Sequence, residues 1–188
     1  MTWENYCYLI EKYRLSRGFA SEWDLAILME YVAKIPEQGV YVEIGVSEGS
    51  SILSVAKERP DVDCIGIEIE GQYVKGLNAA QQEDIKNITM VHGDSTDICR
   101  SWHKEVDMMF IDGDHYMPQV FLDVIGWLPF IKKDGYMLFH DFEKLEQSPL
   151  FHVHLLGKIF RGHGRYITRI PSMEENMSTS MMIVQKIW

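Results

Sequence analysis

Short runs of apolar residues alternate with amphipathic segments through most of the chain. The runs are rich in β-branched side chains, which is typical of buried strands, whereas the segments between them carry apolar residues at helical spacing. Strands are therefore expected at 40–44, 64–69, 88–91, 106–111 and 135–140. Near-continuous apolar strands separated by helices indicate a parallel sheet covered on both faces, so the pattern predicts a Rossmann-like α/β fold.

The two ends of the chain depart from this alternation. Amphipathic helices are expected at 3–14 and 21–35, before the first strand. Two last strands, 166–170 and 180–186, flank a polar turn and predict an antiparallel hairpin, which would complete a seven-stranded, mostly parallel sheet. Helices between the strands are expected at 50–56, 73–82, 96–104 and from Pro118 onward. Since no linker or repeat interrupts the chain, residues 1–188 are expected to form a single domain.

The segment from Val40 to Ser51 joins a buried strand to a helix through two glycines. Gly45 breaks the strand, and Gly49 directly precedes a helix with one apolar face. Free backbone N–H groups in the first turn of that helix suit a ligand with a negative end, and glycines let the backbone approach it. Glu43 lies in the strand, where a buried carboxylate needs hydrogen-bond donors. A purely structural turn is the alternative.

Polar side chains follow each predicted strand. The carboxyl ends of parallel strands meet at one edge of a sheet, and ligands bind there where the strand order reverses. These ends carry Glu43 and Gly45, Glu68, Gly93-Asp94-Ser95, Asp112-Gly113-Asp114-His115 and His140-Asp141. Glu68 is placed to accept hydrogen bonds from ribose hydroxyls. The glycine motif is Gly-x-x-x-Gly rather than Gly-x-Gly-x-x-Gly, so the pyrophosphate grip of a dinucleotide site is missing.

Composition narrows the class of partner. A net charge of −10 disfavours nucleic acid and anionic membranes, which leaves a small molecule as the expected partner. Three scattered cysteines without a Cys-x-x-Cys pair indicate reduced thiols and argue against a zinc site. The sequence lacks an apolar run of membrane-spanning length and the basic start of a signal peptide, so a cytoplasmic location is expected. Assembly into a homo-oligomer stays open.

Five motifs resemble, in order and spacing, those of class I S-adenosylmethionine-dependent methyltransferases. They are Val-Glu-Ile-Gly-Val-Ser-Glu-Gly-Ser-Ser (42–51), Gly-Ile-Glu-Ile (66–69), His-Gly-Asp-Ser (92–95), Phe-Ile-Asp-Gly-Asp-His (110–115) and Leu-Phe-His-Asp (138–141). The pattern is most similar to small-molecule O-methyltransferases near macrocin O-methyltransferase and the cephalosporin hydroxylase-like proteins, and more distantly to catechol O-methyltransferase. It covers residues 38–142 strongly and the rest by topology.

The resemblance implies S-adenosylmethionine bound along the strand ends. Gly45 and Ser47 would lie against its methionine part, Ser51 would hydrogen-bond its carboxylate, and Glu68 would take the ribose hydroxyls. Asp94 and Ser95 would border the adenine. The full set of cofactor-binding residues implied is Glu43, Gly45, Ser47, Gly49, Ser51, Glu68, Gly93, Asp94, Ser95 and Asp112.

The catechol-type enzymes also imply a divalent cation, such as Mg²⁺. Asp112 and Asp141 match two of its ligands, but Phe142 stands where the third, an asparagine, would be. His140, Asp114 or water could substitute for that ligand, in keeping with the preference of Mg²⁺ for carboxylate oxygens and water.

His115 stands where the catechol-type enzymes carry a general-base lysine, and a histidine suits proton removal near neutral pH. His115 and Asp112 are therefore the expected catalytic residues, although His115 could instead cap its loop through a hydrogen bond. Trp102 and Trp127 are expected in the core rather than around a substrate. Residues 142–165 fit no regular pattern and are expected to be a variable insertion on the acceptor side.

The expected function is divalent-metal-assisted O-methylation of a small molecule. One rival is a protein that binds S-adenosylmethionine, or a hydroxylase-like relative, without methyl transfer, and Phe142 keeps this rival open. The other is a nicotinamide-dependent oxidoreductase, which the missing dinucleotide motif disfavours.

Overall fold

The computed structural model describes residues 1–15, 22–114, 116–140, 165–167 and 181–187. The strands are β1 (Val40–Ile44), β2 (Asp63–Glu68), β3 (Ile88–His92), β4 (Val106–Ile111), β5 (Ile131–Phe139), β6 (Arg165–Ile167) and β7 (Met182–Gln185). The helices are α1 (Trp3–Tyr13), α2 (Glu22–Val32), α3 (Ser50–Glu58), α4 (Val74–Gln82), α5 (Ser95–Cys99) and α6 (Gln119–Trp127), with 3-10 turns η1 (Gly71–Tyr73) and η2 (Leu128–Phe130).

The strands lie in the order β3-β2-β1-β4-β5-β7-β6. β1 to β5 pair in parallel, whereas β7 is antiparallel to both β5 and β6. The Rossmann-like fold and the C-terminal antiparallel pair are therefore confirmed. The order reverses at β1, which pairs with β2 on one side and β4 on the other. Ligand sites of open α/β sheets form at such a reversal, beyond the carboxyl ends of the strands.

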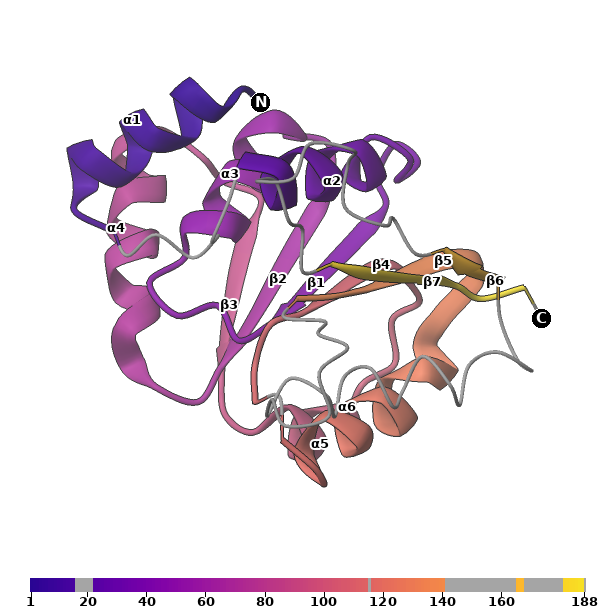
Figure 1. Cartoon of the computed structure of the whole chain (residues 1–188). Coiled ribbons are helices and arrows are strands. Elements are labelled where there is room, and N and C mark those ends of the chain that lie inside the picture. The colour runs from indigo at the N-terminus through magenta and orange to yellow at the C-terminus, as the bar shows by residue number, and fades with distance from the viewer. Residues whose placement is uncertain (16–21, 115, 141–164, 168–180, 188) are drawn as a thin grey trace.

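Helices cover both faces of the sheet, as Figure 1 shows with α1 to α4 on one side and α5 and α6 on the other. Alternate residues of β1 pack into the two apolar clusters on either face of the sheet. Tyr41 belongs to the cluster that contains Tyr6 and Ile52, and Val42 belongs to the cluster that contains Trp127. Because strand side chains alternate between faces, two apolar layers explain why β1 and β4 are apolar at nearly every position.

Aromatic side chains fill the layer under α6. Trp127 is fully buried, and its ring makes edge contacts with Trp102 at 4.9 Å and with Phe130 at 6.1 Å. Its indole nitrogen also donates to the carbonyl oxygen of Ser95 at 3.2 Å. The prediction of a core position is therefore confirmed for Trp127, whereas Trp102 is partly buried and packs against that core.

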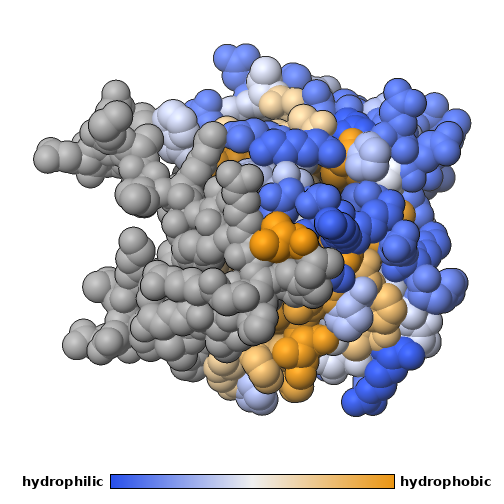
Figure 2. Space-filling model, turned by 90° about the vertical axis from the view of Figure 1, so that its right-hand side faces the viewer, coloured by the Kyte–Doolittle hydropathy of each residue, from blue (hydrophilic) through white to orange (hydrophobic). Residues whose placement is uncertain are grey.

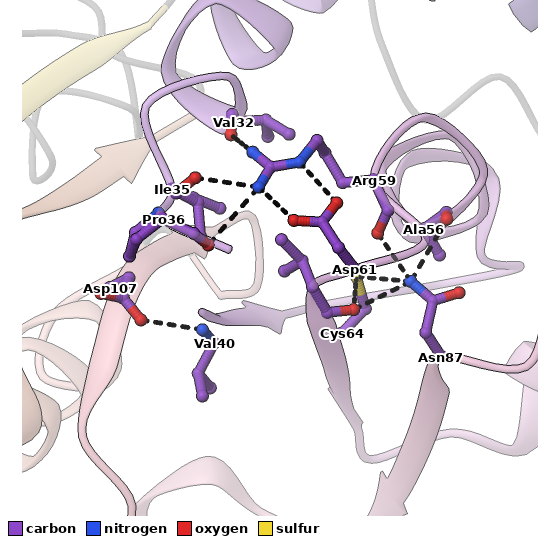
Figure 3. A network of polar contacts seen from close by, with 11 residues as sticks. Val32, Ile35, Pro36, Val40, Ala56, Arg59, Asp61, Cys64, Asn87 and Asp107 are labelled. Atoms are coloured by element: carbon purple, nitrogen blue, oxygen red, sulfur yellow. Dashed lines mark hydrogen bonds and ion pairs between the residues drawn. The ribbon is translucent and has the colours of Figure 1, made fainter. Parts of the chain in front are cut away.

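A network of polar side chains connects the helix ends and loops at the amino ends of the strands (Figure 3). Arg59 donates to the carbonyl oxygens of Val32 at 2.8 Å and Ile35 at 2.9 Å, just where α2 ends, and it pairs with Asp61 at 2.6 Å. Asn87 donates to the carbonyl oxygen of Arg59 at 2.9 Å. The end of α2, the end of α3 and the start of β3 are thereby tied together.

Several predicted boundaries were wrong; α2, for example, ends at Val32 rather than at 35. β5 begins at Ile131 rather than 135, because the polar Lys132 contacts both oxygens of Asp107 at 2.9 Å beside a shift in the β4–β5 register. α5 ends at Cys99 instead of reaching 104. β2 ends at Glu68, and Ile69 beyond it is 63% exposed.

Residues 142–164 of the predicted insertion and the polar turn before the last strand lie outside the described residues, whereas residue 165 begins β6. Leu122 and Ile125 on the outer face of α6 are exposed. Figure 2 shows the side of the molecule that lies at the right in Figure 1, where the described surface is mainly hydrophilic and apolar side chains gather in the lower half. Within the described part of the chain, every helix is too short or too polar to cross a membrane.

Candidate active site

A cavity of about 390 Å³ opens at the carboxyl ends of β1 to β4, where the strand order reverses. It is lined by Ile44, Gly45, Ser47, Ile67, Glu68, Ile69, Glu70, Gly93, Asp94, Ser95, Asp112, Gly113, Asp114, Gln119 and Asp123. Residues far apart in the sequence thus share one site, because parallel strands deliver their following loops to the same edge. Of the predicted cofactor-binding residues, the structure brings together Gly45, Ser47, Glu68, Gly93, Asp94, Ser95 and Asp112.

Gly45 forms the floor of the cavity because the turn after β1 runs against the end of β4. Its φ is +83°, and a Cβ at this position would lie 2.4 Å from the carbonyl oxygen of Asp112 and 2.6 Å from Cα of Gly113. Backbone atoms cannot yield as a flexible side chain would, so only glycine fits this close approach. The approach places Asp112 directly beside the turn.

Glu68 connects the ends of β1 and β2. Its Oε2 accepts a hydrogen bond from the backbone N–H of Ser47 at 2.6 Å, and its Oε1 accepts one from the N–H of Glu70 at 3.0 Å. Each carboxylate oxygen has a further lone pair, so these two bonds fix the orientation of Glu68 and leave acceptor capacity for a ligand.

Glu43 and Ser51 lie beneath the turn, outside the lining of the cavity. Glu43 is fully buried and accepts hydrogen bonds from the hydroxyls of Ser51 and Tyr41, the latter at 2.7 Å. Burial raises the pKa of Glu43 to about 8, against the opposing effect of these two bonds. The Ser51 hydroxyl thus donates to Glu43 in this structure, and its predicted contact with a ligand carboxylate stays a prediction.

Gly49 also lies outside the lining, at the start of α3. Its φ is +92°, and a Cβ there would come within 3.1 Å of Cα of Gly76 in α4. A Cβ added to Gly76 would be closer still to its neighbours, because it would lie 2.6 Å from the carbonyl oxygen of Glu48. The turn and α4 therefore touch backbone to backbone. Lys75 forms an ion pair with Glu48 next to this contact.

The end of β3 supplies the opposite wall through Gly93, Asp94 and Ser95. Asp94 caps α5 by accepting hydrogen bonds from the Thr96 N–H at 2.8 Å and the Thr96 hydroxyl at 2.5 Å. The hydroxyl of Ser95 donates to Asp123 on α6. Capping residues at such a turn hold the backbone in place for a ligand that packs against it.

Asp112 follows β4 and lines the cavity, with its Oδ1 3.0 Å from Nδ1 of His140. His140 follows β5 and is buried, and its Nε2 lies 3.9 Å from Oδ2 of Asp24 on α2. The imidazole thus lies between two carboxylates, one of them at the cavity. His115 and Asp141, the predicted general base and second metal ligand, fall outside the described residues.

Gln119 and Asp123 also line the cavity and were not predicted, because they lie on α6 and not at a strand end. Asp123 accepts hydrogen bonds from Ser95 and from Gln119, the latter at 3.2 Å. Burial raises the pKa of Asp123 to about 6. A signal was available: Gln119 and Asp123 lie four residues apart, on one face of an otherwise apolar helix.

The charge of the cavity is one-sided. Six of its described lining residues carry carboxyl groups, namely Glu68, Glu70, Asp94, Asp112, Asp114 and Asp123, and none of the described lining residues is lysine, arginine or histidine. Such a cavity attracts cationic groups and repels phosphates, because its low-dielectric walls screen these charges less than water does.

The described residues do not fit a divalent-cation site on their own. In that part of the chain, no group of three or more His, Cys, Asp or Glu side chains could hold a metal ion. Of the two aspartates expected to hold the cation, Asp112 is described, and its Oδ1 lies 3.0 Å from Nδ1 of His140, one of the proposed substitutes for the third ligand.

The comparisons with known proteins match this geometry. The chain is 27% identical over 125 residues to the uncharacterized protein R132 of Acanthamoeba polyphaga mimivirus, covering 58% of this chain and 54% of that protein. It is 25% identical over 157 residues to a tRNA (guanine-N(7)-)-methyltransferase of Pediococcus pentosaceus, covering 76% of this chain and 73% of the relative. The chain thus spans about half the length of the mimivirus protein.

A solved structure shares the fold across nearly the whole chain. The O-methyltransferase TomG of Streptomyces achromogenes, which takes part in tomaymycin synthesis and was solved with S-adenosylmethionine, aligns with a TM-score of 0.74 at 14% identity. The alignment covers 98% of this chain and 89% of TomG. The family model described as a methyltransferase domain matches residues 42–142, more than half of the chain and all of the strand ends that build the cavity. The chain therefore belongs to this methyltransferase-domain family.

Proposed function

We propose that the chain is an S-adenosylmethionine-dependent methyltransferase that methylates an oxygen of a small molecule. The acid-lined cavity at the strand-order reversal, with Glu68 fixed at its centre, is the observation that carries the proposal. In this arrangement, the turn at Gly45 and Ser47 takes the methionine part of the cofactor. Glu68 takes the ribose hydroxyls, and the wall after β3 takes the adenine.

The charge of the cavity favours this cofactor over a dinucleotide. S-adenosylmethionine carries a sulfonium and an ammonium group, and both gain from nearby carboxylates. A nicotinamide dinucleotide would instead bring a pyrophosphate into a cavity where the lining residues that the structure describes include no basic side chain. The same argument disfavours a nucleotide phosphate of any kind at this site.

The reaction proposed is a displacement at the sulfonium methyl carbon. A lone pair of the acceptor oxygen forms the new C–O bond while the C–S bond breaks, and its electron pair leaves sulfur as a neutral thioether. The hydroxyl proton of the acceptor passes to a base, for which His115 is the candidate. Alignment of donor and acceptor supplies most of the acceleration in such a step. Asp112 lies beside Gly45, so it would lie near the methyl group of a cofactor bound at this turn.

A cation on Asp112 and Asp141 stays a hypothesis. If one bound there, it would lower the pKa of the acceptor hydroxyl. The described residues do not form that site without Asp141, so no step above depends on a cation.

The net charge of the chain is the reason for proposing a small-molecule acceptor. A tRNA (guanine-N(7)-)-methyltransferase is among the relatives, which makes guanine N7 of tRNA the competing acceptor. A net charge of −10 would oppose a polyanionic acceptor, since binding to nucleic acid depends on basic side chains that neutralise phosphates. TomG, an O-methyltransferase in tomaymycin synthesis, shares the fold. A small-molecule acceptor would not meet the charge repulsion that a tRNA would meet.

Calorimetry with S-adenosylmethionine, S-adenosylhomocysteine and NAD at low and high salt tests the proposal. We expect both adenosyl ligands to bind and NAD to fail. Added salt should weaken S-adenosylmethionine more than the uncharged-sulfur product, because it screens the carboxylates. Binding of NAD alone would overturn the proposed cofactor.

A methyl-transfer assay with a panel of hydroxylated small molecules and with bulk tRNA then separates the two acceptors. Transfer to tRNA alone would overturn the small-molecule assignment. Cofactor binding without transfer to either would favour a binding protein.

A further inference from the structure

Asp123 is a carboxyl group built into the wall of the cavity from the side of α6. It is 1% exposed, yet it belongs to the residues that line the cavity. Asp123 is not a strand-end residue, and no part of the cofactor has been assigned to it above. A buried carboxyl group at a ligand cavity needs hydrogen-bond donors to offset its desolvation.

The protein supplies donors to only one of the two oxygens. The hydroxyl of Ser95 and the amide nitrogen of Gln119 both donate to Oδ1, the latter at 3.2 Å. Among the described residues, none donates to Oδ2. Oδ2 is not sealed off from the cavity, so a ligand that donates a hydrogen bond at this point would gain affinity.

The surroundings hold this carboxyl group in place. Ser95 is itself fixed, since its carbonyl oxygen accepts the indole N–H of the fully buried Trp127 at 3.2 Å. Gln119 lies one helical turn before Asp123 on the same helix. Asp123 is therefore positioned by α5 and α6 together, on the wall that adjoins Gly93 and Asp94 rather than beside Glu68.

We propose that Asp123 selects the base of the cofactor, with Oδ2 accepting a hydrogen bond from the exocyclic amino group of a 6-aminopurine. This inference rests on the proposed function, which places methionine at the Gly45 turn and ribose at Glu68. The donor left for the wall after β3 is then the amino group of adenine. A 6-oxopurine would present a carbonyl oxygen to the carboxylate, and two acceptors facing each other repel.

The size of the selection follows from the same chemistry. Sites that hydrogen-bond a ligand group reject analogues lacking it far more strongly than apolar pockets do, so we expect a discrimination of about 100-fold or more. The raised pKa of Asp123, about 6, adds a pH dependence. Below that pH the protonated carboxyl could donate to a 6-oxo group, and the discrimination should shrink.

The test compares S-adenosylhomocysteine with its deaminated analogue S-inosylhomocysteine by calorimetry at pH 8 and pH 5. For the unmodified protein we expect the adenosine form to bind at least about 100-fold more tightly at pH 8, with a smaller ratio at pH 5. This comparison needs no substitution, so it does not depend on whether a variant folds. Equal affinities for the two ligands at pH 8 would overturn the inference.

Asp123→Asn supplies the second measurement. The amide can turn its N–H toward a 6-oxo group, so the ratio at pH 8 should fall below about tenfold and lose its pH dependence. Asp97→Asn is the matched control, because Asp97 lies on α5 and is exposed; its ratio should equal that of the unmodified protein. A folded Asp123→Asn with an unchanged ratio would assign base selection to another residue.

The proposed function and the role of Asp123 can be overturned separately. If neither nucleoside binds the unmodified protein, the proposed cofactor falls and the role of Asp123 falls with it. If S-adenosylhomocysteine binds but the base is not discriminated, the proposed function stands and only the role of Asp123 is overturned.

Discussion

The carboxylate of Glu68 holds the backbone of Ser47, with 2.6 Å between Oε2 and the Ser47 nitrogen. Ser47 has a φ of +51°, a left-handed conformation that residues other than glycine adopt infrequently. One residue at the end of β2 therefore stabilises the shape of the turn after β1. The same carboxylate is the proposed acceptor for the ribose hydroxyls, so it serves both the site and its ligand.

Glu68→Ala should for this reason weaken both cofactor binding and folding. We expect a loss of about 2–3 kcal/mol in S-adenosylmethionine affinity, which is the usual range for hydrogen bonds to a charged group. The melting temperature should also fall, since the N–H groups of Ser47 and Glu70 lose their acceptor. Calorimetry and thermal denaturation measure the two effects. Glu105→Ala is the control, because Glu105 is exposed and lies outside the cavity lining. Unchanged affinity in a folded Glu68→Ala would exclude the ribose contact.

Gly45→Ala should abolish detectable cofactor binding and destabilise the protein. The added Cβ would meet the backbone at Asp112 at 2.4 Å, so the turn and the end of β4 must separate. Gly71→Ala is a matched control, because a Cβ there would meet no atom within 4 Å. Calorimetry with S-adenosylmethionine and urea denaturation of both variants check the prediction. Equal behaviour of the two variants would show that the close approach at Gly45 is unimportant.

Glu43 should make the protein less stable as the pH rises. Its pKa is about 8 in the folded protein against 4.5 for an ordinary glutamate, so between these values the folded state binds more protons than the unfolded chain. The free energy of unfolding then falls with rising pH across this window. Asp123 acts with the same sign, but only between 3.8 and about 6.

The interval from pH 6 to pH 8 therefore separates Glu43 from Asp123, and the comparison with Glu43→Gln removes the contribution of the histidines, which also titrate there. Urea denaturation at both ends should show a loss of stability in the unmodified protein and a smaller loss in Glu43→Gln, which cannot ionise. Parallel slopes for the two proteins would mean that Glu43 is already ionised at pH 6.

Arg59→Ala should lower stability without touching the cavity. The guanidinium group satisfies the carbonyl oxygens of Val32 and Ile35, so its removal should cost about 2 kcal/mol, or about 5 °C in melting temperature. Arg100→Ala should change the melting temperature little, because its pair with Asp97 is exposed. Thermal denaturation distinguishes the two. A loss of cofactor affinity in Arg59→Ala at a temperature where it is folded would contradict this division.

Apolar periodicity predicted the centre of the sheet well because burial on both faces leaves an unambiguous signal. The bounds of β1 and β4 agree with the predicted 40–44 and 106–111. The start of β5 was missed because Lys132 and its neighbours look like a turn in isolation. What makes them part of a strand is the buried Asp107, more than twenty residues earlier.

The candidate site shows the same division. Strand ends could be predicted because parallel strands share one carboxyl edge, and this placed Glu68 and Asp112 at the cavity correctly. Whether a polar side chain near that edge faces the cavity or the core could not be predicted. Glu43 and Ser51 pair with each other beneath the turn, whereas Asp123 reaches the cavity from a helix. These choices depend on how helices pack across the sheet, and no local spacing encodes that.

The contact between Gly49 and Gly76 has a mechanical consequence. With no side chain between the turn and α4, no compressible layer can absorb a displacement, so the two segments move as one rigid unit. A ligand that stiffens the turn would therefore also stiffen α4, which lies on the outside of the molecule (Figure 1). Binding of a ligand in the cavity should accordingly slow amide hydrogen exchange in α4, although α4 does not line the cavity.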